Sequence, residues 1–175
     1  MNVYRYPAST VLGLLADSHG RADTTRLAVD LLVAEGAEVL IHLGDICDDA
    51  VLDALAGHVA HVVFGNCDDN WRRLAEYGRS IGVLVDHPCG RVRVGDRSVV
   101  FAHGDNPTHE QDAVSAGADY FCHGHSHQTR DELLNRTRIV NPGALFRASR
   151  YTVVRLEPGS GRVDVLSIDA VRASG

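Results

Sequence analysis

Phe121-Cys122-His123-Gly124-His125-Ser126-His127 closes a short apolar run with a glycine set between imidazoles. If residues 118–122 form a strand, His125 and His127 lie in the loop just past its end. Neutral imidazole is the commonest metal-binding side chain, and glycine lets the backbone turn tightly enough to aim two of them at one point. An isolated His-x-His is equally typical of a solvated polar loop, but four other apolar runs here also end in Asp, Asn or His. Five such endings predict a shared site at the ends of strands.

The composition is that of an ordinary globular protein. The 175 residues are 45% apolar and 23% charged, and their number falls within the ~100–200 residues of one domain. We find no repeat, linker or low-complexity segment, so we expect a single domain over residues 1–175. No stretch approaches the ~18 apolar residues of a membrane span, and residues 11–16 lack the basic flank and cleavage pattern of a signal peptide. These features predict a cytoplasmic protein with no membrane partner.

The formal net charge is −6, which argues against non-specific binding to nucleic acid or anionic membranes. A phosphate substrate stays compatible with this charge, because bound metal ions can reverse the local sign. The four cysteines form no Cys-x-x-Cys pair. We therefore expect free thiols in a reducing compartment.

The first half of the chain alternates between strands and helices. Apolar runs at 10–16, 39–43 and 59–64 are typical of strands buried on both faces. We expect Asp23 or Thr24 to cap the helix after the first run. The order β-α-β-α-β predicts a parallel sheet with right-handed crossovers, in which ligands collect beyond the carboxyl ends of the strands.

The second half changes character. Residues 91–94 and 98–102 flank Gly95-Asp96 and predict an antiparallel hairpin. Helical patterns also occupy 50–55, 69–77 and 107–116, and further strands are expected at 130–134, 138–140, 151–156 and 163–168.

The strand ends supply two carboxylates, one amide oxygen and four imidazoles. This mixture is too hard for a structural zinc site and too rich in imidazole for magnesium or calcium. Seven side chains are too many for one ion, but they suit two ions of manganese, iron or zinc that share a carboxylate. Two ions ~3.5–4 Å apart can clamp a phosphoryl group and activate a water between them. The candidate ligands are Asp17, His19, Asp45, Asn66, His103, His125 and His127.

With these motifs in the order Asp-x-His, Gly-Asp-x-x-Asp, Gly-Asn-x-Asp, His-Gly and Gly-His-x-His, the chain resembles the calcineurin-like metallophosphoesterase superfamily. It is most similar to the small single-domain bacterial and archaeal phosphodiesterases, over residues 11–147. The resemblance implies an α/β fold: a four-layer α/β/β/α sandwich with two facing mixed β-sheets flanked by helices.

The resemblance also implies a role for each motif residue. The first ion would be held by Asp17, His19, Asp45 and His127, and the second by Asp45, Asn66, His103 and His125, with Asp45 as the bridge. Asp45, Asn66 and His103 would be the catalytic group. Two divalent ions are implied, with Mn²⁺ expected first and Fe, Zn or Ni as alternatives. We expect Asp48, Cys67, Asp68 and Asp105 to surround the ligands, with the carboxylates tempering the field and orienting imidazoles.

One departure from the family pattern concerns position 67. Many relatives have a histidine after Gly-Asn that helps to protonate the leaving group, whereas this chain has Cys67. General acid catalysis is typically worth ~10²–10⁴-fold. We therefore expect esters with poor leaving groups to be hydrolysed least well.

Other residues near the motifs have two interpretations each. His42 and His123 could support the ligands or only pack. Arg147 and Arg150 could meet a phosphate or be solvated. Trp71 is typical of a core residue, with a lid as the alternative. Asn141-Pro142-Gly143 predicts a tight turn, which the resemblance places at the rim of the site.

The predicted function is a metal-dependent phosphoesterase, first of all a phosphodiesterase acting on small phosphate esters. The alternative is a non-catalytic protein-interaction scaffold of the same fold, like a retromer subunit. A nuclease is less compatible with a short acidic chain. The physiological substrate, the native metal and the oligomeric state, a homo-oligomer included, stay open.

Overall fold

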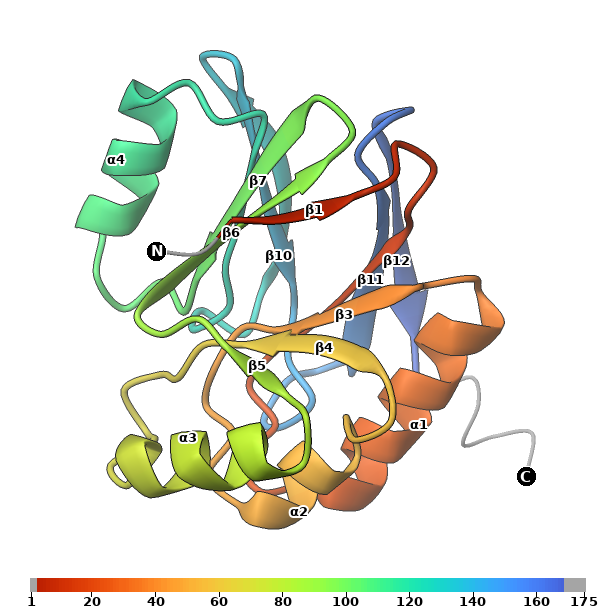
Figure 1. Ribbon diagram of the computed structural model, residues 1–175, viewed down its shortest axis with the longest axis vertical. Helices are drawn as coiled ribbons and strands as arrows, with labels where there is room; N and C mark the ends of the chain where they lie inside the picture. Colours follow the sequence, from red (N-terminus) through yellow and green to blue (C-terminus); the bar gives the residue numbers. More distant parts are fainter. Residues whose placement is uncertain (1–2, 169–175) are drawn as a thin grey trace.

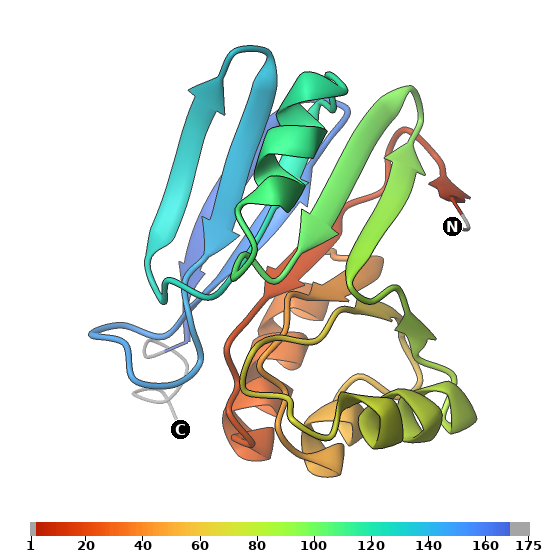
Figure 2. The same ribbon diagram turned by 90° about the vertical axis from the view of Figure 1, so that its left-hand side faces the viewer.

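The computed structural model describes residues 3–168 and has four layers. Two mixed sheets face each other, and helices cover the outer face of each sheet (Figures 1 and 2). This arrangement confirms the predicted α/β/β/α sandwich. In spatial order, the first sheet contains β1 (Tyr4–Tyr6), β6 (Cys89–Val94), β7 (Arg97–Ala102), β8 (Tyr120–Cys122), β10 (Thr137–Pro142) and β9 (Thr129–Leu134).

The second sheet carries the predicted parallel strands at its centre. Leu12 pairs with Val39, and Val39 pairs with Val59, both in parallel register. The last hairpin of the chain extends this sheet in antiparallel fashion. In spatial order, the sheet contains β12 (Arg162–Ser167), β11 (Thr152–Glu157), β2 (Leu12–Leu15), β3 (Val39–His42), β4 (Val59–Val62) and β5 (Leu84–Val85).

Within residues 3–168, three helices cover the second sheet and one covers the first (Figure 1). They are α1 (Ala22–Ala34), α2 (Asp49–Asp53) and α3 (Trp71–Ser80) on the second sheet, and α4 (Thr108–Ser115) on the first. The predicted cap of α1 is wrong: Arg21 occupies the N-cap position without a side-chain bond, so Asp23 and Thr24 lie inside the first turn. Gly20, at φ 76°, turns the chain directly after His19 and lets the helix begin earlier. Within residues 3–168, no helix combines the length and apolar character needed to cross a bilayer.

Three apolar layers hold the sandwich together. Leu12 and Leu14 of β2 point between the sheets, whereas Leu15 points toward the helices that cover the second sheet. A smaller cluster around Phe121 fills the space between α4 and the first sheet. Because successive side chains of a strand point to opposite faces, β2 needs apolar residues on both sides. The continuous apolar run in the sequence reflects this double burial.

A buried polar chain ties the two sheets together at one edge. The Tyr6 hydroxyl of β1 lies 2.7 Å from Nε2 of His61 in β4, and Nδ1 of His61 lies 2.7 Å from an oxygen of Asp86. His61 has no exposed surface. The three residues satisfy one another where the apolar layer between the sheets ends.

Candidate metal centre

The seven predicted ligands all follow strands, and the backbone turns sharply at most of them. Asp17 and His19 follow β2, and Asp45 follows β3. The Asp17 N–H donates to the Gly44 carbonyl at 3.0 Å, and the His19 N–H donates to the Asp45 carbonyl at 2.8 Å. These bonds lock the two loops together. The ligand positions with positive φ, between 44° and 67°, are Asp17, His19, Asp45, His125 and His127.

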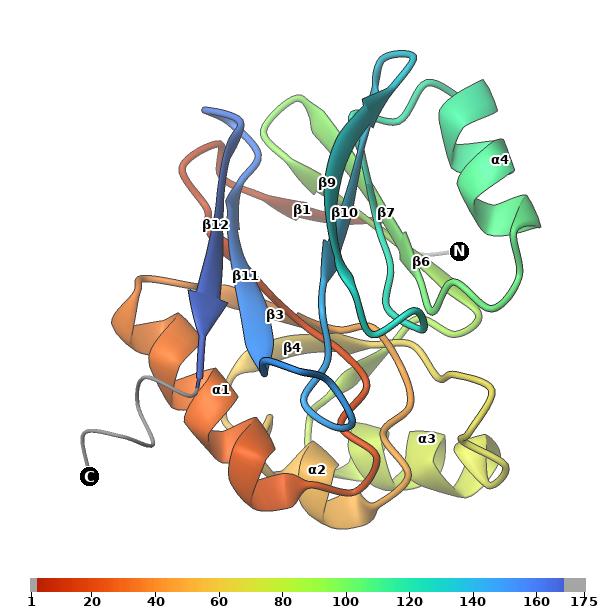
Figure 3. The same ribbon diagram turned by 180° about the vertical axis from the view of Figure 1, so that it is seen from behind.

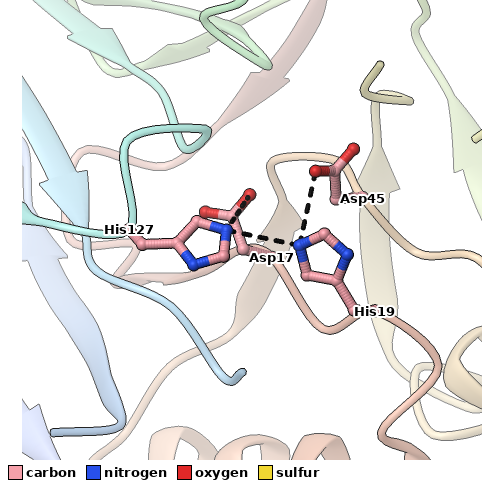
Figure 4. Close-up of side chains that lie close together, drawn as sticks. All are labelled: Asp17, His19, Asp45 and His127. Atoms are coloured by element: carbon pink, nitrogen blue, oxygen red, sulfur yellow. Dashed lines mark hydrogen bonds and ion pairs between the residues drawn. The ribbon is translucent and has the colours of Figure 1, made fainter. Parts of the chain in front are cut away.

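Four of these side chains converge on one point, as Figure 4 shows. One ligand atom from each of Asp17, His19, Asp45 and His127 lies within 4.8 Å of the other three. The Nε2 atoms of His19 and His127 are only 3.3 Å apart. Oδ2 of Asp45 lies 3.4 Å from Nε2 of His19. The set that the resemblance assigns to the first ion is therefore assembled in this fold.

Asp17 shows most directly that this cluster suits a cation. Its side chain is fully buried, one oxygen accepts the His125 N–H at 3.2 Å, and the other oxygen has no hydrogen-bond partner. Burial, followed by the charge of Asp45, raises the pKa of Asp17 to about 8. A buried carboxylate without a partner is costly unless a positive charge compensates it. A divalent ion would supply that charge.

The second predicted set is looser. His103 is buried, and its Nε2 lies 3.1 Å from Oδ1 of Asn66. The His103 and His125 rings are 5.1 Å apart between centroids. Asn66 and His125 are both exposed. Half of this set therefore projects into solvent from loops.

The His103 ring is oriented as a metal ligand would be. Its Nδ1 lies 2.8 Å from the Leu43 carbonyl, which can only accept, so Nδ1 carries the proton of a neutral ring. Nε2 then presents a lone pair toward the amide oxygen of Asn66. Two acceptors that face each other at 3.1 Å suit a cation near both of them.

Asp45 connects the two sets. While Oδ2 faces His19, Oδ1 lies 3.5 Å from Nε2 of His103 and accepts the Cys67 N–H at 2.9 Å. One carboxylate thus offers one oxygen to each set. The imidazoles and carboxylates present fit two divalent ions of the borderline type.

Two glycines let the loops approach this closely. A Cβ at Gly65 would lie 2.2 Å from Oδ1 of Asp45 and 2.6 Å from the His103 ring. At Gly44, where φ is 99°, a Cβ would lie 2.6 Å from Nδ1 of His103. The Gly-Asp and Gly-Asn motifs therefore need glycine for space as well as for conformation.

The residues expected around the ligands have different places. Asp68 is buried and accepts the Cys47 N–H at 2.7 Å and the Gly65 N–H at 2.8 Å, so it joins two ligand loops rather than orienting an imidazole. Asp48 is exposed and caps α2 through the Ala50 N–H. Asp105 is exposed, and within residues 3–168 no hydrogen bond joins it to a ligand. Within residues 3–168, neither Asp48 nor Asp105 therefore forms a hydrogen bond with a ligand side chain.

Cys67 is exposed on the loop that carries Asn66. Burial of its neighbourhood, followed by the charge of Asp45, raises the pKa of the Cys67 thiol to about 11. Because its pKa is raised, the Cys67 thiol stays neutral beside the ligands. Burial has the opposite effect on a base and lowers the pKa of the His19 imidazole.

Two supporting residues lie beneath the loops. His42 is fully buried, accepts the Gly44 N–H at 3.3 Å and lies 2.6 Å from the Ser18 hydroxyl. Asn141 donates to the Gly124 carbonyl at 2.7 Å and accepts the Gly143 N–H at 2.9 Å. The predicted tight turn is wrong at Asn141 and Pro142, which pair with β9 at the end of β10, and the Asn141 side chain instead holds the loop that carries His125.

The segment of residues 143–151 joins β10 to β11 and forms the rim of the candidate metal centre on the side of β2 (Figure 3). Its Phe146 ring lies 5.4 Å from the His19 ring, with the guanidinium groups of Arg21 and Arg147 at 4.8 Å and 5.1 Å. Phe146 could not be singled out from the sequence, because no motif includes it. Trp71 packs against Phe64 and His87 instead, as expected of a core residue.

Comparison with known proteins gives consistent matches. The family model for the calcineurin-like phosphoesterase superfamily domain matches residues 11–160. Phosphodiesterase MJ0936 of Methanocaldococcus jannaschii is 25% identical over 137 residues, which cover 75% of this chain and 82% of the relative. The structure of an archaeal phosphodiesterase has a TM-score of 0.82 at 21% identity, covering 90% of this chain and 99% of its own. The structure of zinc-complexed Vps29 from Entamoeba histolytica has a TM-score of 0.61 at 15% identity, covering 91% of this chain and 99% of its own.

Proposed function

Because this chain belongs to the calcineurin-like phosphoesterase superfamily, we propose that it is a binuclear metal-dependent phosphodiesterase acting on small phosphate esters. The observation that carries the proposal is the pair of ligand sets joined by Asp45, whose two oxygens face His19 and His103. When bound, two divalent ions would attract the phosphate group and make a water between them nucleophilic near neutral pH.

The chain's own residues would do the positioning. Asp17, His19 and His127 hold one side of the centre, and Asn66, His103 and His125 hold the other side. The Leu43 carbonyl keeps the His103 ring in the tautomer that leaves Nε2 free. With Cys67 where an imidazole would donate a proton, the leaving group takes its proton from solvent.

We further propose manganese as the native metal, since mixed imidazole and carboxylate ligation suits it. Iron, zinc and nickel are the alternatives. A cytoplasmic location fits the four free cysteines, which persist in reducing compartments. Residues 1–175 would form one domain, with a small phosphate ester as its partner.

The direct test combines metal analysis with two esters. After loading with Mn²⁺ and removal of excess, elemental analysis should approach two equivalents per chain. Bis(4-nitrophenyl) phosphate should then be hydrolysed faster than 4-nitrophenyl phosphate, and a chelator should abolish both activities. One equivalent that persists in excess metal would contradict the binuclear centre.

The same experiment separates the enzyme from the scaffold alternative. The fold likeness to Vps29 is compatible with a scaffold but does not favour it over the enzyme. Two bound metals without hydrolysis of either ester would point to the scaffold, whereas turnover that requires metal would exclude a purely structural role.

A further inference from the structure

A cavity of about 490 Å³ opens directly beside the metal centre. One of its walls is the ligand residue His127, and the cavity extends from there to Thr129, where β9 begins, and Ser167, where β12 ends. The segment of residues 148–150 closes another side. A substrate bound at the metals can therefore continue past His127 into this space.

Apart from Ala148 and Val165, the residues within 3–168 that line the cavity are polar, and Arg150 is the one arginine among them. Gln128, Thr129, Ser149 and Ser167 present amide and hydroxyl groups, and within residues 3–168 these four side chains form no hydrogen bond. The Ser126 hydroxyl bonds only to the backbone of Gln128 among these residues. No acidic or aromatic residue lines the cavity within residues 3–168. The lining thus favours an anionic, hydrogen-bonding ligand over a stacked ring.

Arg150 is the one guanidinium of the lining, and within residues 3–168 no carboxylate pairs with it. The other arginine of residues 143–151 differs: Arg147 lies over the Phe146 ring and is not part of the lining. An unpaired guanidinium presents several donors in a planar fork that matches phosphate oxygens. Arg150 is therefore the group that would select a charged ligand.

We propose that this cavity binds a second phosphate group of the substrate through Arg150, so that the preferred substrates are phosphodiesters whose organic part carries a further phosphate. This inference rests on the proposed function, because it places the scissile phosphate at the metal centre. The neutral hydroxyl and amide groups contact the organic part, and Arg150 recognises the charge. Arg150 is thus a specificity-determining residue outside the reacting atoms.

A matched pair of substrates tests the proposal. Thymidine 5′-(4-nitrophenyl phosphate) and its 3′-phosphorylated counterpart share the scissile bond and the leaving group, and they differ by one phosphate. For the Mn²⁺-loaded wild type, we expect KM to be about tenfold lower for the 3′-phosphorylated substrate, with similar kcat. In Arg150→Gln the two KM values should become equal, and Arg150→Lys should keep part of the difference.

Arg147→Gln is the matched control, since it removes the same charge from the same segment outside the cavity. It should keep the tenfold ratio of KM values. Equal KM values in the wild type, or a ratio that Arg150→Gln leaves unchanged, would overturn the proposal. Loss of the ratio in Arg147→Gln as well would show a general charge effect and would also overturn it.

Calorimetry separates failure of this inference from failure of the proposed function. Thymidine 3′,5′-bisphosphate should bind the wild type about tenfold more tightly than thymidine 5′-monophosphate, and this preference should disappear in Arg150→Gln. If neither nitrophenyl ester is hydrolysed, the proposed function fails, and the calorimetric preference still decides whether Arg150 reads a second phosphate. Equal affinities for the two nucleotides would overturn the inference whether or not the protein is an enzyme.

Discussion

The two predicted ligand sets of the candidate metal centre are built differently. On one side, Asp17 and Asp45 are buried, and four ligand atoms already lie within 4.8 Å of one another. On the other side, His103 is buried, but Asn66 and His125 are exposed on loops. The first side is positioned by backbone bonds between strand ends, and the second side depends on loops that solvent reaches.

This difference predicts an order of metal affinity. A preassembled set loses little conformational entropy when it binds an ion, whereas exposed loops must be ordered first. The first side should therefore bind its ion more tightly, and the second ion should be the one that is lost on dilution.

Asp45→Asn should have the largest effect, because this carboxylate serves both sides. We expect both metals to be lost and turnover to fall by on the order of 10³-fold or more. His103→Ala should remove only the second ion and leave about one equivalent bound. Metal analysis and kcat of the two variants test this. Near-normal activity of Asp45→Asn would show that Asp45 is not the bridge.

The pH dependence of the unfolding free energy of the metal-free protein measures the cost of burying the Asp17 carboxylate. The pKa of Asp17 is raised from 3.8 to about 8 in the folded protein, so the unfolded chain loses this proton first as pH rises. The contribution of Asp17 to the free energy of unfolding is therefore largest below pH 4. This contribution is lost as the pH rises toward 8, and the loss is on the order of 5 kcal/mol.

Urea unfolding at pH 5 and pH 8 in the presence of chelator measures this loss. Asp17→Asn has no ionisable group at this position. Between the two pH values, its free energy of unfolding should therefore fall by several kcal/mol less than that of the wild type. Adding Mn²⁺ to the wild type at pH 8 should restore its stability, because the ion replaces the proton. Parallel pH profiles for the wild type and Asp17→Asn would refute this account.

The smallest expected effect concerns Cys67 on the exposed side. Without an imidazole, the rate should fall steeply as the leaving-group pKa rises, so nitrophenyl diesters should react far better than alkyl diesters. Cys67→His should make that dependence shallower, because the new imidazole should raise the rate of hydrolysis of alkyl esters by about tenfold. The gain stays modest because both oxygens of Asp68, the candidate to orient the new ring, already accept backbone N–H groups.

A series of diesters with graded leaving groups, assayed on both proteins at equal metal content, measures the two slopes. Equal slopes would mean that the proton comes from elsewhere, with His19 or a bound water as the first candidates. A flat slope in the wild type would show that proton donation is not missing.

Much of the fold could be predicted because its central strands are buried on both faces. Runs such as Val39–His42 show this directly in the sequence, and each run ends in the motif it positions. The strands at 4–6 and 84–85 escaped prediction because three and two residues are too few to show a period. Their place depends on partners distant in the sequence.

The ligand side chains were predictable for the same reason, but their surroundings were not. Asp48 belongs to a recognisable motif, yet its carboxylate caps a helix. Conversely, Phe146 belongs to no motif and lies against His19. The buried link between Tyr6, His61 and Asp86 joins elements from both sheets. Such contacts arise from tertiary packing, which spacing along the chain does not encode.

The left-handed backbone at the ligand positions predicts an evolutionary signature. Outside glycine, this conformation costs roughly 1–2 kcal/mol per residue, and it occurs at Asp17, His19, Asp45, His125 and His127. Glycine at any of them would relieve that cost and delete a ligand. A lineage that kept the fold only as a binding surface would gain stability by drifting toward glycine there, whereas selection for hydrolysis would oppose every such step. The side chains retained at these five positions in descendants therefore report whether catalysis is still under selection.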